Sequence, residues 1–436
     1  MEILKRHEEI NYEKYESEEN LEAYYHLPVH VKFCKECVVS NQMPNSCVEM
    51  KNGKEQKKET IHFDSDGLCD ACKVAKQKEN MIDWEERERQ LFDLCDKYRK
   101  SDGTYDCLVP GSGGKDSFYA SYLLKYKYHM HPLTVTWAPH MYTPWGYDNF
   151  QAWIASGMDN ITVTPNSKVH RIITRLATEI LLHPYQPFMI GQKNIAPKIA
   201  VKLNIPLIFY GENQAEYGNS PIKNNDNALM DASFFSSDER NQLLLGGIKY
   251  QELIDDFHID PADLELYMPT LVDDIDANNI EMHYLGYYEK WHPKEIFKFA
   301  AEHSDFKPSP VRTAGTYTNY AGIDDKIEAL NFYTTFIKFG IGRATYDASQ
   351  EVRNKEITRE EGMELIRKYD GEWPSLFEED FMKYLSLPAK DFPDASKWFE
   401  QPIMDKEYFM HLCDRFRSPH IWKYTNGEWK LRNTVY

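Results

Sequence analysis

The stretch CLVPGSGGKDSFYASYLL (residues 107–124) constrains the fold more than any other part of the sequence. A short apolar run enters a loop with three glycines, and an apolar, helix-like run follows at once. Glycines allow a tight turn whose N–H groups point into one concavity, and the N-terminus of the following helix favours an anion. The stretch therefore predicts a phosphate site between a strand and a helix. Its spacing differs from that of the mononucleotide loop G-x-x-x-x-G-K-[ST].

Short apolar runs alternate with longer helical patterns from residue 105 onward. The predicted strands are YDCLVP (105–110), PLTVTW (132–137), NITVTP (160–165) and IPLIFY (205–210), with MHYLGYY (282–288) as one more candidate. The predicted helices between them include DSFYASYLLKYKY (116–128), KVHRIITRLATEILL (168–182) and NIAPKIAVKLN (194–204). Strands that alternate with helices predict an α/β fold with a parallel sheet flanked by helices.

Four regions are expected along the chain. Residues 1–30 form a polar lead-in, residues 31–100 hold a cysteine-rich module and a linker helix, residues 101–290 form the α/β domain, and residues 291–436 form a mostly helical C-terminal module. In the last region, Thr358 stands three residues before Glu361, which predicts a capping box at the start of a helix.

Composition narrows the classes of function. The formal net charge of −18 argues against a nucleic-acid surface, which usually carries a basic excess. No apolar run approaches the roughly 18 residues needed to cross a bilayer, and the charged N-terminus lacks the apolar stretch of a signal peptide. We therefore expect a cytoplasmic protein whose cysteines are thiols or metal ligands.

Two CxxC pairs, Cys34/Cys37 and Cys69/Cys72, predict a structural zinc site, because four thiolates suit tetrahedral Zn²⁺. The segment between the pairs is longer than in a compact zinc ribbon, so an insertion must loop out. A redox pair and an iron–sulfur cluster are the alternatives. Cys47 is a possible substitute ligand, while the remaining cysteines are expected to be buried thiols: Cys95, Cys107 and Cys413.

The hexapeptide SGGKDS resembles the loop of the PP-loop ATP pyrophosphatases, in which ATP is cleaved between its α- and β-phosphates. By this resemblance the pyrophosphate ligands are Ser112, Gly113, Gly114, Lys115, Asp116 and Ser117, and the adenine lies near Thr136 and Trp137. Lys115 and Asp116 are also expected to act in catalysis. The alternative is an incidental turn rich in small residues.

A second signal is GENQAEYG (211–218), which follows the strand IPLIFY. Ligands of open α/β sheets bind at the carboxyl ends of strands, so Gly211 is expected at the ATP site, Glu212 in catalysis and Asn213 near the substrate. Carboxylates here, including Glu216, suit Mg²⁺ bridging the phosphates. The alternative is a solvated loop.

The combination of motifs resembles the N-acetyl sugar amidotransferases of bacterial surface-polysaccharide biosynthesis. The matching blocks are FDSDGLCDAC (63–72), VPGSGGKDSFY (109–119), TPNSKVHRIITRLA (164–177), YGENQAEYG (210–218), GTYTNYAGIDDKIEALNFY (315–333), IKFGIGRATYDASQEVR (337–353) and ITREEGMELIRKYDGEWP (357–374). The chain departs from the family in the extra material between its CxxC pairs and in GSGGKDS where VSGGKDS is usual. The resemblance implies ATP-dependent conversion of a sugar acetamido group into an acetamidino group, in pathways to amidino-bearing uronic acids or to pseudaminic- or legionaminic-type acids.

The substrate then carries an anionic group, for which the candidate ligands are His170, Arg171, Lys338 and Arg343. An ordinary surface or core role is the alternative for each. Asp324, Asp325 and Asp347 are weaker candidates, because N-capping of a helix explains the first two equally well.

The nitrogen donor is expected to be ammonia, either from solution or from a separate glutaminase subunit. The chain begins Met1-Glu2 and contains no Gly-x-Cys-x-Gly elbow, so no glutaminase nucleophile is evident. Two rival functions remain. Some tRNA-thiolating enzymes also join a PP-loop to CxxC pairs, and a non-catalytic nucleotide-binding scaffold is the other alternative.

Overall fold

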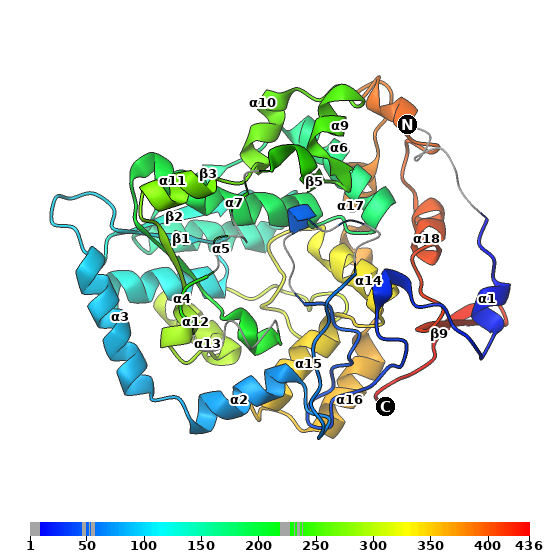
Figure 1. The fold of residues 1–436 in the computed structure, drawn as a ribbon, viewed down its shortest axis with the longest axis horizontal. Helices are drawn as coiled ribbons and strands as arrows, with labels where there is room; N and C mark the ends of the chain where they lie inside the picture. Colours follow the sequence, from blue (N-terminus) through cyan, green and yellow to red (C-terminus); the bar gives the residue numbers. More distant parts are fainter. Residues whose placement is uncertain are drawn as a thin grey trace.

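The computed structural model describes residues 9–45, 49–51, 53, 57–218, 227–230, 232, 236–237 and 239–436. At its centre is a parallel five-stranded sheet with the order β3-β2-β1-β4-β7 (Figure 1). The strands are β1 (Cys107–Pro110), β2 (Pro132–Trp137), β3 (Asp159–Val163), β4 (Leu207–Tyr210) and β7 (Glu281–Tyr284). The predicted α/β fold with a parallel sheet is confirmed.

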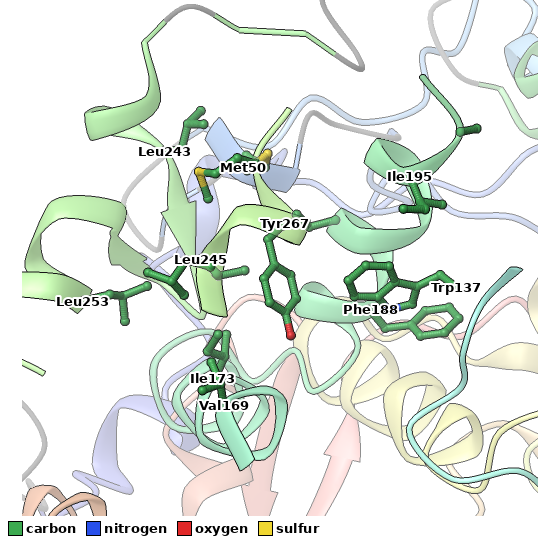
Figure 2. Close-up of a cluster of buried hydrophobic side chains, with 14 of the residues drawn as sticks. Met50, Trp137, Val169, Ile173, Phe188, Ile195, Leu243, Leu245, Leu253 and Tyr267 are labelled. Atoms are coloured by element: carbon green, nitrogen blue, oxygen red, sulfur yellow. The ribbon is translucent and has the colours of Figure 1, made fainter. Parts of the chain in front are cut away.

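Helices cover both faces of the sheet, which explains why its strands read as continuous apolar runs. Leu108 and Ile208 point to one face, into a cluster with α6 (Ser167–Leu181) and α7 (Gln186–Leu203), part of which is shown in Figure 2. Their neighbours Val109 and Phe209 point to the other face. That face is covered by α3 (Trp84–Tyr98), α4 (Lys115–Tyr122), α12 (Leu285–Tyr288) and α13 (Pro293–His303).

The strand order reverses at the centre of the sheet. From β1 the chain moves outward through β2 and β3, and then returns to the opposite side of β1 with β4 and β7. The carboxyl ends of β1 and β4 therefore lie side by side at the reversal, where open α/β sheets bind their ligands. Both singled-out loops, SGGKDS and GENQAEYG, follow these two strands.

Three predicted elements differ in extent. The segment MHYLGYY is a strand only as far as Tyr284, after which α12 begins. The helix predicted from Asp116 ends at Tyr122 and continues as a π-helical turn, Leu123–Lys127. Helix α7 begins at Gln186 rather than at Asn194 and runs through Pro197. A proline has no N–H for the carbonyl one turn earlier, and the Tyr210 hydroxyl donates to that carbonyl, on Lys193, at 3.3 Å.

Residues 291–436 are mostly helical, as predicted. After α13 they form α14 (Glu328–Phe339), α15 (Arg343–Arg353), α16 (Arg359–Tyr369), α17 (Glu378–Leu385) and α18 (Lys406–Asp414). The capping box of Thr358 and Glu361 is confirmed at the start of α16. A hairpin of β8 (Trp422–Thr425) and β9 (Glu428–Leu431) was not predicted. Within the described parts of the chain, no helix has the length and apolar character needed to span a membrane.

The two ends of the chain pack together. The short helix α1 (Glu13–Glu16) lies beside the C-terminal hairpin (Figure 1). The buried Tyr15 hydroxyl donates to the carbonyl of Arg417 at 2.9 Å, and Arg432 donates to the carbonyl of Tyr15 at 2.7 Å. The described part of the polar lead-in is therefore joined to the C-terminal region.

Candidate active site and metal centre

A cavity of about 780 Å³ opens at the carboxyl ends of β1 and β4. One wall, here called the sheet wall, is formed by the lining residues of the SGGKDS loop and of segment 210–217. A second wall, here called the C-terminal wall, is formed by the lining residues of segment 318–354. The charged residues that line the cavity include Lys115, Asp116, Glu212, Asp324, Glu328, Lys338, Arg343, Asp347 and Glu351.

The SGGKDS loop is a tight turn into helix α4. Gly113 has φ +90°, and a Cβ there would lie 2.6 Å from the Cα of Phe150, so glycine is required on two grounds. The Ser117 hydroxyl accepts from the N–H of Gly113 at 3.2 Å and donates to the carbonyl of Gly114 at 3.0 Å. Because α4 begins at Lys115, the unpaired N–H groups of its first turn suit an anion.

Lys115 and two carboxylates form the charged centre of the sheet wall. The Lys115 ammonium is buried and lies 2.6 Å from a carboxylate oxygen of Asp116. Burial and the nearby Asp116 raise the pKa of Glu212 to about 7, although Lys115 opposes the shift. Glu212 can therefore exchange a proton near neutral pH.

Two other acidic or polar residues of the GENQAEYG loop serve the structure. Asn213 is buried and caps the 3₁₀ turn Gln214–Tyr217, accepting from the N–H of Ala215 at 3.0 Å. Glu216 pairs with Lys78 of α2 (Asp70–Asn80) at 2.8 Å. Neither residue lines the cavity. These positions do not favour Asn213 as a substrate ligand or Glu216 as a magnesium ligand.

The side chains expected near adenine are turned into the core. The Thr136 hydroxyl accepts from the Asn160 amide at 3.0 Å, and Trp137 packs beside Phe188 and Tyr267 in the buried cluster of Figure 2. Neither side chain lines the cavity, whereas Pro139, just beyond the strand, does. The expected adenine contacts of Thr136 and Trp137 therefore find no support in the position of their side chains.

His170 and Arg171 also lie outside the cavity lining. Nδ1 of the buried His170 lies 2.8 Å from the Tyr267 hydroxyl. The Arg171 guanidinium donates to the main-chain carbonyls of Tyr384 and Ser386 at 3.0 and 2.6 Å. These contacts join α6 to its neighbours, so the placement favours the structural alternative for both residues.

Lys338 and Arg343, by contrast, reach the cavity. The Lys338 ammonium donates to the carbonyl of Leu181 at 2.9 Å. The Arg343 guanidinium lies 3.0 Å from Asp347 and 4.5 Å from the centre of the Phe332 ring. Lys338 is thus held by the end of α6, and Arg343 by neighbours within the C-terminal wall.

Two further carboxylates line this wall: Asp324, a weaker candidate from the sequence, and Glu328, which the sequence analysis does not single out. Burial raises the pKa of Asp324 to about 6, and the carboxylates of Asp325 and Asp116 add to the shift. Burial raises the pKa of Glu328 to about 8, with Asp324 and Asp325 contributing and Arg343 opposing. Neither Asp324 nor Asp325 is the N-cap of α14, which is Ile327 and has no side-chain capping bond. Asp325 instead accepts from the N–H of Ile327 at 3.0 Å in the turn before the helix.

The four cysteines of the CxxC pairs converge in a buried cluster that could hold a metal ion, here called the four-cysteine centre. Sγ of Cys34 lies 3.8 Å from Sγ of Cys72, and Sγ of Cys37 lies 3.6 Å from Sγ of Cys69. All four sulfur atoms lie within 4.8 Å of one another. A tetrahedron with Zn–S bonds of about 2.3 Å has edges of about 3.8 Å, so the spacing fits one thiophilic ion. A four-iron cluster would separate the thiolates further, because each binds a different iron.

Arginines of the C-terminal region contact the four-cysteine centre. The Arg353 guanidinium lies 3.9 Å from Sγ of Cys37, and Arg359 donates to the carbonyls of Cys34 and Cys37. Four thiolates around one divalent ion carry a net negative charge, which these guanidinium groups would partly neutralise. Cys47, the possible substitute ligand, lies outside the described residues. The other three cysteines are buried, away from the centre: Cys95, Cys107 and Cys413.

Comparisons with known proteins complete this picture. No curated protein matches the chain. Among solved structures, one similar chain is the U34-tRNA thiolase NcsA from Methanococcus maripaludis with its [4Fe-4S] cluster. It is 13% identical, the match covers 73% of this chain and 91% of that chain, and the TM-score is 0.27. Residues 314–436 match the family model of the LPS biosynthesis protein WbpG-like C-terminal domain.

The matched region begins ten residues before Asp324 and includes Glu328, Lys338, Arg343 and Asp347 of the cavity. It also includes Arg353 and Arg359 beside the four cysteines. Residues 314–436 are therefore similar to the C-terminal domain of WbpG-like LPS biosynthesis proteins, which supports the resemblance of the chain to the N-acetyl sugar amidotransferases.

Proposed function

We propose that this chain is an ATP-dependent amidotransferase that converts the N-acetyl group of a sugar into an acetamidino group in bacterial surface-glycan biosynthesis. The observation that carries the proposal is one cavity with two chemically different walls. A pyrophosphatase-type loop forms the sheet wall, and a WbpG-like region forms the C-terminal wall. Amidine formation that is driven by ATP needs an anion site and an acidic site together.

The chemistry explains the need for ATP. An amide carbonyl is a poor electrophile and its oxygen is a poor leaving group. In the proposed reaction, the acetamido oxygen attacks the α-phosphorus of ATP, pyrophosphate departs with the electrons of the broken P–O bond, and the amide nitrogen loses its proton. Ammonia then adds to the carbon of the O-adenylyl imidate, the C–O bond breaks, and AMP leaves. The amidine takes up a proton and becomes cationic.

The sheet wall is assigned to the phosphates. N–H groups of the SGGKDS loop and the Lys115 ammonium stabilise charge on the departing pyrophosphate. Glu212, with a pKa of about 7, suits a proton acceptor at neutral pH. The carboxylate of Asp116 fits Mg²⁺, which prefers one or two carboxylates with phosphate oxygens. When bound, the ion would neutralise phosphate charge.

The C-terminal wall is assigned to the sugar and to nitrogen transfer. Arg343 and Lys338 suit an anionic group of the sugar. Glu328 lines the same wall, and its pKa of about 8 suits uptake of a proton from the ammonia that adds to the imidate. Its ionised form also favours the amidine cation. Ammonia is proposed to come from solution or from a separate glutaminase subunit.

The four-cysteine centre is assigned a structural role with Zn²⁺. Its cysteines lie outside the cavity lining, and contacts from α2, the GENQAEYG loop and α15 meet around it. Metal binding there would supply folding free energy to all three segments.

A tRNA-thiolating activity is the second candidate, and the cysteines oppose it. Sulfur transfer needs a reactive thiolate that the substrate can reach. Every cysteine among the described residues is buried, and burial raises the pKa of Cys107, the one nearest the nucleotide loop in sequence, well above its ordinary value. Titration with bulk tRNA at low salt should show no binding.

The test of the proposal is a reconstituted reaction. The purified chain is incubated with ATP, Mg²⁺, ammonium and a panel of acetamido sugars, and the products are analysed by mass spectrometry. We expect AMP, pyrophosphate and a sugar in which NH has replaced one oxygen. Formation of ADP and phosphate would contradict the assignment of the loop, and Lys115→Ala serves as the inactive control.

A further inference from the structure

One carboxylate at the nucleotide loop comes from the C-terminal region. The Ser112 hydroxyl donates to Oδ2 of Asp324. The other carboxylate oxygen, Oδ1, is buried and has no hydrogen-bond partner among the described residues. A buried charged oxygen without a partner is costly, so its position beside the nucleotide loop points to a ligand that it would bind.

The backbone aims this side chain at the loop. The N–H of Thr143 donates to the carbonyl of Asp324 at 3.0 Å, and the N–H of Lys326 donates to the carbonyl of Met141 at 3.0 Å. Between these bonds, Asp325 pairs with His140 at 2.7 Å, with both side chains fully buried. The segment that carries Asp324 is therefore fixed to the loop after β2.

Close packing supports the same conclusion. Gly146 lies in the first turn of α5 (Pro144–Ala155), and a Cβ there would come within 2.7 Å of the Cα of Asp324. Any side chain at this position would push the segment away from α5. Asp324 is thus held rigidly, as a ligand should be.

The surroundings of Asp324 favour a cation. Its carboxylate is close enough to those of Asp116 and Asp325 to be repelled by both. The Lys115 ammonium is hydrogen-bonded to both oxygens of Asp116. A divalent ion between Asp116 and Asp324 would offset the repulsion and give Oδ1 of Asp324 its missing partner.

We propose that Asp324 is a ligand of the divalent cation that accompanies ATP, so that the C-terminal region completes the nucleotide site of the sheet. This inference rests on the proposed function, because it takes Mg²⁺·ATP as the substrate. Mg²⁺ is usually held by one or two carboxylates plus phosphate oxygens. Asp116 of the loop and Asp324 of the C-terminal region supply two carboxylates that line the same cavity.

The test measures binding of α,β-methylene-ATP to the full chain, by calorimetry, in Mg²⁺ and in EDTA. Asp324→Asn keeps an oxygen for the Ser112 hydrogen bond but removes the charge. In Mg²⁺ we expect this variant to bind at least about 10-fold more weakly than wild type. In EDTA it should bind as tightly or more tightly, because one negative charge facing the phosphates is gone. Asp305→Asn, at an exposed position, is the matched control and should follow wild type in both conditions.

The direction in which the affinity for the analogue changes, in Mg²⁺ and in EDTA, distinguishes a ligand of the cation from a residue that only positions Ser112. If Asp324 only positions Ser112, then Asp324→Asn and Ser112→Ala should alter binding alike in Mg²⁺ and in EDTA, and the inference is overturned. Unchanged binding in both conditions also overturns it. Asp324→Glu, which keeps a carboxylate, should recover part of the Mg²⁺ response. As a second readout, the electron paramagnetic resonance spectrum of Mn²⁺ bound together with the analogue should differ between Asp324→Asn and wild type. Failure of the wild-type chain to bind the analogue at all would instead remove the proposed function.

Discussion

The two walls of the cavity offer a substrate different chemistry. The sheet wall presents loop N–H groups and Lys115, which suit anions. Away from the nucleotide loop, the C-terminal wall presents Glu328, whose pKa of about 8 reflects burial near other carboxylates, together with Lys338 and Arg343. In the proposed reaction pyrophosphate anions develop at one wall while an acetamido group becomes an amidinium at the other. The contrast between the walls therefore matches the two charges that the reaction creates.

The walls are nevertheless joined outside the cavity. Lys78 of α2 pairs with Glu216 behind the sheet wall, and Arg353 of α15 donates to the carbonyl of the same Glu216 at 3.2 Å. The four-cysteine centre lies beside these contacts. A change at the metal centre should thus affect both walls, whereas a change within one wall should affect one half of the reaction.

The largest expected effect is at the sheet wall. Lys115→Ala should lower the rate of AMP and pyrophosphate formation about 1000-fold, because it removes a charge that stabilises the departing phosphates. Binding of the sugar should persist. The measurement is pyrophosphate release, with sugar binding followed by calorimetry, and parallel loss of both would contradict the division of labour between the walls.

A smaller effect is expected at the C-terminal wall. Glu328→Gln should lower amidine formation about 100-fold by removing a proton acceptor, while cleavage of ATP continues. AMP and amidine would then no longer appear in equal amounts, because water can consume the adenylylated sugar. Equal loss of both products would place Glu328 in the first half of the reaction instead.

Replacing a ligand of the four-cysteine centre tests whether this centre supports both walls. Cys34→Ser should lower the zinc content and lower Tm by about 5 °C, since bound metal contributes folding free energy. Full zinc content in a chain with both Cys34 and Cys69 replaced by serine would rule out this ligand set. Cys413→Ser, which changes a buried thiol outside the centre, is the control for metal content.

The smallest expected effect is on the pH dependence of stability. The pKa of Glu212 is about 7 in the folded chain, mainly through burial, against about 4.3 when unfolded. Between these values the folded state binds more protons than the unfolded state, so this group makes stability fall as pH rises from about 4.3 to about 7. Relative to wild type, Glu212→Gln should therefore raise Tm by roughly 1–3 °C at pH 8 and by less at pH 5. A gain that is equal at both pH values would contradict the raised pKa.

Local patterns predict most of the sheet wall and only part of the C-terminal wall, where Lys338 and Arg343 line the cavity as expected. The strands that flank SGGKDS and GENQAEYG are apolar runs with clear boundaries, so the sheet and the positions of Lys115 and Glu212 follow from sequence. The CxxC spacing likewise predicts the four ligands that converge. Asp324 and Glu328 lie in a family-specific block, but their role depends on packing of this segment against α5 and the nucleotide loop. Nothing local distinguishes them from residues that cap a helix.

The candidate residues that do not line the cavity lead to the same conclusion. His170, Arg171 and Asn213 are polar residues close to strand ends, where ligands usually bind. The structure uses each of them for internal hydrogen bonds, to a tyrosine hydroxyl or to the main chain. Side-chain direction and the demand for hydrogen bonds in the core decide such cases, and neither can be read from sequence spacing.

The most direct measurement follows the acetamido oxygen. The central claim is that both walls act on one substrate, so that the sugar oxygen attacks ATP at the sheet wall and departs with AMP. An acetamido sugar labelled with ¹⁸O in its carbonyl group is turned over with ATP, Mg²⁺ and ammonium, and the AMP is analysed by mass spectrometry. The account predicts one ¹⁸O in the phosphate of each AMP formed. Unlabelled AMP, with the label released into water or retained in the sugar, would contradict it.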